Sequence, residues 1–292
     1  TAIVAVAGGL GVIIPPSIPF IMYGMASGES VSDLFLAGII PGLLISGLLM
    51  VYAWLYCRKN GEDREKIAEV VGELHKKGLA AVLKESFWAI LSPVIILGCI
   101  YTGLTSPTEA AVISVFYALI VSLLIYKSIK VKELWSIFVE AVRTYGPIMF
   151  ILAASVAFSR VLTLMQVPQL VSAWILTHFT SKIVLLLVIN VFLLIVGMVM
   201  DTTPAILILT PILLPIVEAA GMNGIHFGIM MVVNLAVGFV TPPIGVNLFV
   251  AGSISNVPVM HVARKAAPMI VYFLIALLLI TFIPAISLVL IS

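Results

Sequence analysis

Long apolar runs, separated by a few short polar segments, dominate the pattern of this chain. Seven runs are close to the length of a membrane-crossing helix, which needs about 20 residues to span the hydrocarbon core. They cover residues 2–25, 34–56, 87–104, 110–126, 145–165, 228–251 and 266–290. An eighth stretch, 183–217, carries Asp201 and two threonines at its middle. The pattern predicts two shorter helices there, either as a re-entrant hairpin or as two short or tilted spans.

The composition agrees with membrane insertion. Of the 292 residues, 62% are hydrophobic and only 10% are charged, and the mean hydropathy is +1.27. Soluble proteins are about 25% charged. These values exclude soluble enzymes, nucleic-acid readers and disordered scaffolds, and the net charge of +2 gives no sign of a nucleic-acid partner. We therefore expect an all-α polytopic membrane protein surrounded by a lipid bilayer.

Basic residues indicate the orientation of the spans. Thirteen of the 15 Lys and Arg residues fall in the segments 58–84, 127–143 and 264–265. The positive-inside rule places all three segments in the cytoplasm. The number of crossings between these segments agrees with this orientation if the stretch around Asp201 enters and leaves the membrane on the outer side. Two full spans in that stretch would also be an even number, so they would fit equally well. Segments 58–85 and 128–143 have helical spacing and are predicted to lie on the cytoplasmic surface, with a solvated loop as the alternative.

An internal repeat runs in opposite orientations. The segment Gly11-Val12-Ile13-Ile14-Pro15-Pro16 resembles Gly238-Phe239-Val240-Thr241-Pro242-Pro243 at an offset of 227, and Pro41 falls on Pro268 at the same offset. The charge pattern makes the first copy cross outward and the second inward. Copies of one motif that cross in opposite senses are typical of inverted-repeat secondary transporters.

The paired prolines predict unwound helices in the membrane. Proline lacks an N–H and disfavours the α conformation of the residue before it. The freed carbonyls need a partner in hydrocarbon, and a bound cation or polar substrate can supply one. The alternative is a kink whose carbonyls are satisfied by neighbouring helices.

Three polar residues near the breaks are candidate ligands, each with a structural alternative. A carboxylate at mid-membrane costs about 2.5–3.5 kcal/mol, so Asp201 either contacts a cation or substrate at a hairpin tip or caps the next helix. Asn247 could supply a carbonyl oxygen or merely bond the unwound backbone. Ser17 follows Pro16, where freed N–H groups and the hydroxyl would bind an anion, or it caps the helix that restarts there.

The motifs resemble those of a known transporter family. They are Gly11 to Ser17, Tyr23-Gly24, Leu36 to Gly42, Thr105 to Ala111, Asp201 to Ala205 and Gly238 to Asn247. Together they resemble the large membrane subunit, of the DctM permease type, of tripartite ATP-independent periplasmic (TRAP) transporters. They run through nearly the whole chain. The poorest fit is Thr105-Ser106-Pro107, where the family often has Thr-Pro-Thr without the serine.

This resemblance implies a function. The family's large subunits import organic acids across the bacterial inner membrane, driven by a sodium gradient, with an elevator-like alternating-access mechanism. A periplasmic binding protein delivers the substrate, and a small membrane subunit, separate or fused, accompanies the large one. Sialic acid and four-carbon dicarboxylates are both handled in the family. Sodium ions are the transported cofactors, and they lie between hairpin tips and broken helices.

The residues and the resemblance together predict two sets of ligands and a domain plan. The sodium ligands are expected to be Gly8, Gly11, Pro15, Asp201, Thr202, Thr203, Gly238 and Thr241, and the substrate ligands Ser17, Asp201 and Asn247. The transport domain comprises residues 1–57 and 167–292, with a hairpin at 182–218 and a broken helix at 225–253. A connector covers 58–85 and scaffold spans cover 86–166. The repeat offset puts a partner hairpin upstream of Thr1, so we expect a longer protein.

Two other functions compete with this one. A passive channel or pore for small anions would not need paired helix breaks with a carboxylate at one tip. An intramembrane aspartyl protease needs two carboxylates that share a proton, and only Asp201 is placed deep enough. The sequence therefore favours a transporter over an enzyme.

Overall fold

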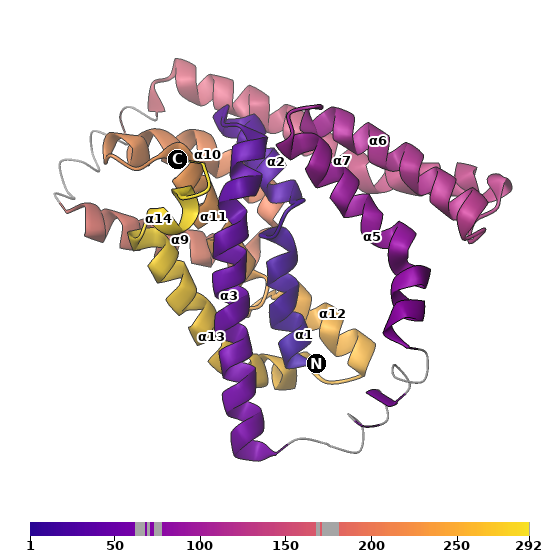
Figure 1. Cartoon of the computed structure of the whole chain (residues 1–292). Helices are drawn as coiled ribbons and strands as arrows, with labels where there is room; N and C mark the ends of the chain where they lie inside the picture. The colour runs from indigo at the N-terminus through magenta and orange to yellow at the C-terminus, as the bar shows by residue number, and fades with distance from the viewer. Residues whose placement is uncertain (62–67, 69–70, 73–77, 168–169, 171–180, 292) are drawn as a thin grey trace. The chain divides into compact units, whose positions relative to one another are not determined.

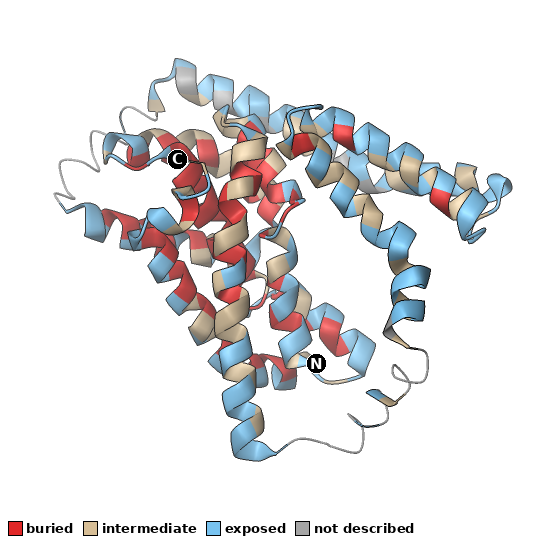
Figure 2. Cartoon of the chain, in the orientation of Figure 1, coloured by how far each residue is buried: buried red, intermediate tan, exposed pale blue. Residues whose placement is uncertain are grey.

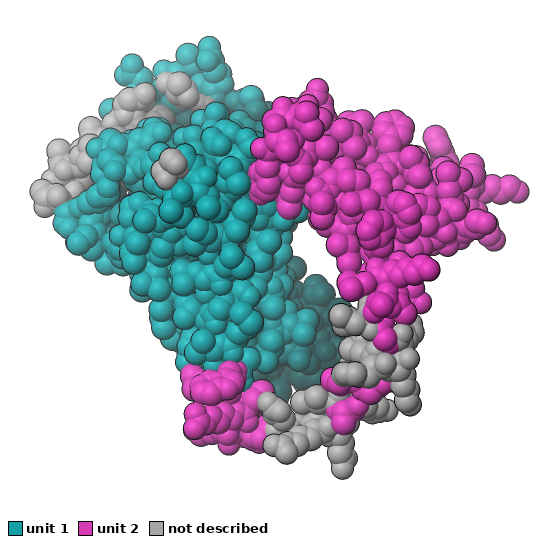
Figure 3. Space-filling view, viewed as in Figure 1, with its two compact units in different colours: residues 1–53, 145–292 teal, residues 54–144 magenta. Residues whose placement is uncertain are grey.

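The computed structural model describes residues 1–61, 68, 71–72, 78–167, 170 and 181–291. Every regular element in these residues is helical, and six helices are long and apolar enough to cross a membrane (Figure 1). The expected all-α polytopic fold is confirmed. The chain divides into two compact units, residues 1–53 with 145–292 and residues 54–144 (Figure 3).

The first unit contains both repeat copies and the helices around Asp201. The first copy consists of α1 (Ala2–Ala7), the 3₁₀ turn η1 (Gly8–Val12), α2 (Ile18–Ser27) and most of α3 (Val31–Asn60). The second copy consists of α11 (Gly224–Gly238), α12 (Val246–Ser255) and α13 (Val259–Phe282), followed by α14 (Ala285–Leu288). The helices that flank Asp201 are α9 (Lys182–Val199) and α10 (Thr202–Ala219), and α10 contains Pro211 and Pro215.

The repeat predicted from the paired prolines extends to the boundaries of the helices. The first break separates η1 from α2, and the second separates α11 from α12 at the position reached by the offset of 227. Both proline pairs are joined by cis peptide bonds. Pro41 and Pro268 lie inside α3 and α13. The two copies therefore share a helix–break–helix–helix order.

The core of this unit is built around α11. All 15 residues of α11 are buried, as expected of a helix that is apolar on every side. It packs against α9, α10 and α13, while α10 packs against α2 and α1 packs against α12 and α13 (Figure 2). The helices around Asp201 and the two broken helices thus form one packed group.

The second unit is built around a pair of helices. Its helices are α5 (Leu79–Tyr101) and α6 (Pro107–Ile120), with α6 continuing into one π-helical turn, η2 (Val121–Ile125). The Tyr117 hydroxyl donates to the Trp88 carbonyl at 2.7 Å, and the Tyr126 hydroxyl to the Glu85 carbonyl at 2.6 Å. A capping box begins α6, in which the Ser106 hydroxyl and the Glu109 carboxylate satisfy each other's backbone N–H groups.

Three segments depart from the expected boundaries. The short 3₁₀ turn η3 (Val131–Glu133) leads into α7 (Leu134–Leu164), which is continuous where a surface helix at 128–143 and a separate span were expected. The helix α13 begins at Val259, so Arg264 and Lys265 lie within its first turns, where long side chains extend to the interface. The expected connector 58–85 is shorter in the structure, since α3 ends at Asn60 and α5 begins at Leu79, and residues 62–67, 69–70 and 73–77 lie outside the described part of the chain.

Candidate functional site

The first break is closed by hydrogen bonds from its own residues. The amides of Ile13 and Ile14 donate to the Leu10 carbonyl at 3.0 and 2.9 Å. The Ser17 hydroxyl donates to the Val12 carbonyl at 2.6 Å and accepts from the Phe20 amide at 3.4 Å. Ser17 is only 1% exposed. Its hydroxyl therefore has two partners in the chain, which is the geometry of a cap.

The second break is more open. Its residues Pro242, Pro243 and Ile244 are exposed. The backbone N–H of Asn247 donates across the break to the Phe239 carbonyl at 3.1 Å. The Thr241 hydroxyl donates to the Val237 carbonyl at 2.7 Å. Because its proton is engaged there, the lone pairs of this oxygen stay available to a cation.

The two breaks meet through glycines of η1. A Cβ at Gly8 would lie 2.9 Å from Nδ2 of Asn247, and a Cβ at Gly9 would lie 3.5 Å from the Ala236 carbonyl oxygen. No such neighbour exists at Gly11, where a Cβ would meet nothing within 4 Å. The structure thus brings the predicted residues Gly8 and Asn247 together and leaves Gly11 in open space.

The helix α9 reaches the second break through another pair of glycines. A Cβ at Gly197 would lie 3.0 Å from Cα of Leu235, and a Cβ at Gly238 would collide with the Gly197 backbone. Glycine permits this approach because it has no Cβ. Gly197 lies one turn before Asp201, and Gly238 is the last residue of α11. The segment Met200–Thr203 therefore begins close to the end of α11, and Thr241 lies three residues after that end.

The residues at the turn between α9 and α10 are arranged as a polar tip. Asp201 occupies the N-cap position of α10 but makes no side-chain capping bond, and it is exposed. Thr202 is only 3% exposed, and its hydroxyl donates to Oδ1 of Asp201 at 3.2 Å. Thr203 is half-buried. The Asp201 side chain therefore does not act as the cap that was the alternative to a ligand.

Asn247 carries an unpaired donor. Its side-chain Nδ2 is buried and has no hydrogen-bond partner among the described residues. A buried amide without a partner costs about 1–3 kcal/mol. The side chain does not bond the unwound backbone through Nδ2, so this donor is free for a ligand oxygen.

A buried amide network lies beside these elements and was not predicted. Nδ2 of Asn234 donates to Oδ1 of Asn190 at 2.7 Å, and the Thr281 hydroxyl donates to the same oxygen at 3.3 Å. The three residues come from α11, α9 and α13. Each is a polar residue within a mostly apolar stretch of its helix, which is the pattern that could have identified them.

No group of three or more His, Cys, Asp or Glu residues capable of holding a metal occurs in the part of the chain that the structure describes. Sodium, however, is bound by carbonyl, hydroxyl and carboxylate oxygens, which prefer hard cations. Oxygens of these kinds occur at both breaks and at the tip, in Pro15, Gly238, Thr241, Asp201, Thr202 and Thr203. The chemistry of this set suits a small monovalent cation.

Comparisons with known proteins agree on one family. Residues 1–286 match the model of the tripartite ATP-independent periplasmic transporter, DctM component. The isethionate TRAP transporter permease protein DctMQ of Oleidesulfovibrio alaskensis is 43% identical over 98% of this chain and 44% of its own length. The C4-dicarboxylate TRAP transporter large permease protein DctM of Pseudomonas aeruginosa is 39% identical, over 98% of this chain and 66% of its own.

A third relative handles a different acid. The sialic acid TRAP transporter large permease protein SiaM of Vibrio cholerae is 34% identical over 97% of this chain and 67% of its own length. The chain thus spans from 44% to 67% of the length of these three relatives.

Proposed function

The chain belongs to the DctM family of tripartite ATP-independent periplasmic transporters, and we propose that it forms the transporting part of a sodium-coupled importer of an organic acid. The substrate would be a four-carbon dicarboxylate, a sialic acid or a related acid. Delivery would come from a periplasmic binding protein at the bacterial inner membrane. A small membrane subunit would complete the complex, as the fused name DctMQ of one relative suggests.

The close approach of α9 to α11 is the observation that carries this proposal. Gly197 and Gly238 pack backbone to backbone, one turn before the carboxylate of Asp201. Unwound backbone carbonyls at the end of a half-helix are the groups with which transporters of this kind bind cations. We place sodium between Asp201, Thr202 and Thr203 on one side and the carbonyl of Gly238 and the hydroxyl of Thr241 on the other. Gly8, Gly11 and Pro15 would contribute at the first break.

The substrate carboxylate is proposed to bind at Asn247. Its unpaired Nδ2 lies beside Gly8, so the donor sits where the two breaks approach each other. Asp201 would act on the substrate through the bound sodium, because two bare carboxylates repel. The capping bonds of Ser17 leave its hydroxyl a weaker candidate for the substrate, and its contribution there stays a prediction.

Alternation between the two sides would follow the elevator type of movement. The first unit, which holds both breaks and the tip, would be the moving body. An intramembrane protease is not supported, since the relatives are named as transporter permeases.

The decisive experiment measures uptake in proteoliposomes with the complete permease and its binding protein. Asp201→Asn should abolish uptake or weaken its dependence on sodium, while membrane insertion is retained because a costly charge is removed. Asp33→Asn makes the same charge change in the first turn of α3 and should leave sodium dependence unchanged. Sodium dependence equal to wild type in Asp201→Asn would contradict the cation site. Uptake without any gradient would favour a passive pore.

A second variant tests the substrate ligand. Asn247→Asp keeps the shape of the side chain but replaces the donor with a carboxylate, which repels an anionic substrate. We expect the apparent KM for substrate to rise at least about tenfold, the equivalent of about 1.4 kcal/mol. An unchanged KM would remove Asn247 from the substrate site without affecting the sodium proposal.

A further inference from the structure

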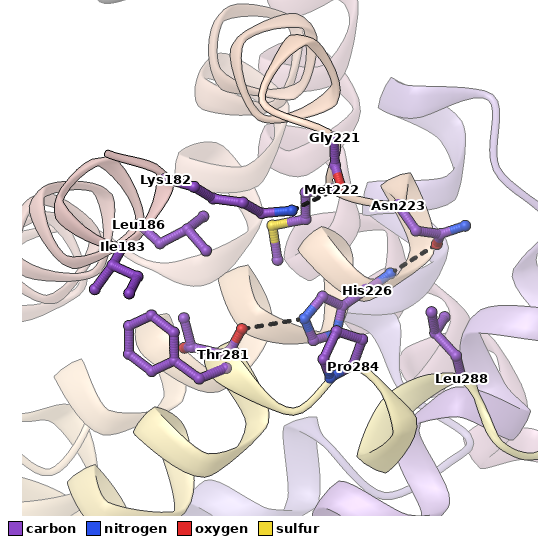
Figure 4. Close-up of a pocket in the computed structure, with 11 residues that line it drawn as sticks. Lys182, Ile183, Leu186, Gly221, Met222, Asn223, His226, Thr281, Pro284 and Leu288 are labelled. Carbon is purple, nitrogen blue, oxygen red and sulfur yellow. Dashed lines mark hydrogen bonds between the residues drawn. The ribbon is translucent and has the colours of Figure 1, made fainter. Parts of the chain in front are cut away.

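A cavity of about 700 Å³ lies at one end of the first unit, away from both breaks. It is bordered by the start of α9, the start of α11, the end of α13 and α14, and its lining includes Lys182, Ile183, Leu186, His226, Phe282 and Leu288 (Figure 4). Its size falls within the range of small-ligand sites. Arg264 and Lys265 lie near the opposite end of α13. The positive-inside rule therefore puts the cavity at the outer face of the membrane.

His226 supplies an unused polar atom to this cavity. The residue is 2% exposed, and its Nε2 lies 3.3 Å from the Thr281 carbonyl oxygen. A carbonyl only accepts, so Nε2 carries the proton and Nδ1 of the neutral ring is an acceptor. Nδ1 is buried and has no hydrogen-bond partner among the described residues. The ring in Figure 4 lies between Thr281 and Pro284 in the cavity wall. The histidine in the wall thus holds an acceptor that no described residue uses.

Lys182 supplies a positive charge to the same cavity. Its Nζ donates to the Gly221 carbonyl at 2.7 Å, which uses one of its three N–H donors. Among the described residues that line the cavity, none is acidic. The charge of Lys182 is therefore left for an anionic group of the ligand, such as a phosphate.

Apolar residues make up most of the remaining wall, and they continue onto the surface of the helices. Ile183 is 59% exposed and Phe282 39% exposed. Along α9, Val184 and Leu187 are also exposed. On a helix in a bilayer such a surface faces acyl chains, so the cavity opens from a charged end toward hydrocarbon.

We propose that this cavity binds a membrane phospholipid whose headgroup carries a hydrogen-bond donor, of the phosphatidylethanolamine or phosphatidylglycerol type. The phosphate accepts from Lys182. The ammonium or hydroxyl group of the head donates to Nδ1 of His226. An acyl chain lies over Ile183 and the exposed side of α9. This site is separate from the sodium and substrate ligands described above.

The test uses the complete permease, delipidated in detergent and titrated with lipids of identical acyl chains. Bound lipid is counted by native mass spectrometry. Phosphatidylethanolamine and phosphatidylglycerol should bind roughly tenfold more tightly than phosphatidylcholine, whose methylated head cannot donate. Soluble glycerophosphoethanolamine should not compete at equal concentration, because it lacks acyl chains.

Variants assign the contacts. Lys182→Gln should weaken the binding of all three lipids by a similar factor. Lys265→Gln, which lies at the end of α13 away from the cavity, should leave the binding of all three unchanged. His226→Phe should bind phosphatidylethanolamine and phosphatidylcholine equally. If that variant fails to fold, Lys182→Gln still decides the matter. Equal binding of the three lipids to wild type, no response to Lys182→Gln, competition by the soluble headgroup, or no retained lipid would each overturn the proposal.

Discussion

The two broken helices carry the same proline motif, but their surroundings differ. Every residue of α11 is buried, whereas in α1 only Ala5 and Val6 are buried. The exposed fraction of Val4 in α1 is 69%, against 0% for Met231 at the equivalent position of α11. The second copy is covered by α9 and α10, which pack on α11. The motif therefore determines where a helix breaks, and in the second copy α9 and α10 bury the helix that leads into the break.

Gly11 and Gly238 give the clearest contrast. They occupy the same place in the repeat, but a Cβ at Gly11 meets nothing within 4 Å, while one at Gly238 collides with the Gly197 backbone. Among the described residues, Gly238 is thus packed against another backbone and Gly11 is not.

The largest effect is expected from adding a methyl group at this pair of positions. Gly238→Ala should destabilise the protein by about 3 kcal/mol or more, because the obstacle is backbone that cannot rotate away. Gly11→Ala should change stability by less than about 1 kcal/mol. Thermal unfolding of the purified variants compares them. Equal losses in both would show that the packing at Gly197 is not what distinguishes the copies.

The next effect concerns the amide network, which links α9 to two helices of the second copy. At the position of Asn234, the first copy has the exposed Ala7. Asn234→Leu should cost about 1–2 kcal/mol of stability, since Oδ1 of Asn190 loses its shortest partner. A double-mutant cycle with Asn190→Leu measures the coupling. Additive losses in the cycle would mean that the 2.7 Å contact contributes nothing.

The residues at which the helices restart after each break should give effects of about 1 kcal/mol. Ser17→Ala removes the cap of α2 and should cost about 1 kcal/mol. Gly245 begins α12 at a φ of +54°, so Gly245→Ala should cost about 1–2 kcal/mol through strain in the left-handed region. Unfolding temperatures provide the measurement. If Ser17→Ala instead raises KM at constant stability, Ser17 binds substrate.

The smallest effect lies in the turns that follow α2 and α12. Glu29 follows α2, and Asn256 stands at the equivalent position after α12. Burial, followed by the charges of Glu218 and Asp33, raises the pKa of Glu29 above its ordinary value of 4.5. The folded state then binds this proton more tightly than the unfolded state, so ionisation destabilises the fold above the raised pKa.

Glu29→Gln should therefore stabilise the protein at pH 7 by less than about 1 kcal/mol, which is measured as a slight rise in the unfolding temperature. The gain should shrink as the pH falls toward 4.5, because wild-type Glu29 then becomes neutral too. Ser30→Ala, a neutral change in the same turn, should give a difference that does not vary with pH. A gain for Glu29→Gln that is constant across this range would contradict the charge repulsion.

Local chemistry made several features predictable. The paired prolines located both breaks, because proline cannot continue a helix hydrogen-bond ladder. Asp201 marked the turn between α9 and α10, and Ser17 was correctly identified as a possible cap. Ser106 and Glu109 begin α6 for the same reason, since capping depends on residues close in sequence.

Contacts between distant segments were not predictable in this way. Nothing near Gly197 in the sequence indicates that its backbone meets Gly238, and a single histidine such as His226 has no spacing that reveals a cavity. The continuity of α7 was missed because its polar first half and apolar second half were assigned to different environments. Residues 134–164 contain no strong terminating signal except Gly146 and Pro147, and the helix continues through both.

The amide network makes the two helices beside Asp201 mechanically unequal. Through Asn190, α9 is cross-linked to both α11 and α13, so these three helices resist separate displacement. In contrast, α10 contains Pro211 and Pro215, each of which removes a rung from its hydrogen-bond ladder. We therefore expect α9 to resist bending more than α10 does, so that a movement of the turn at Asp201 would bend α10 rather than α9.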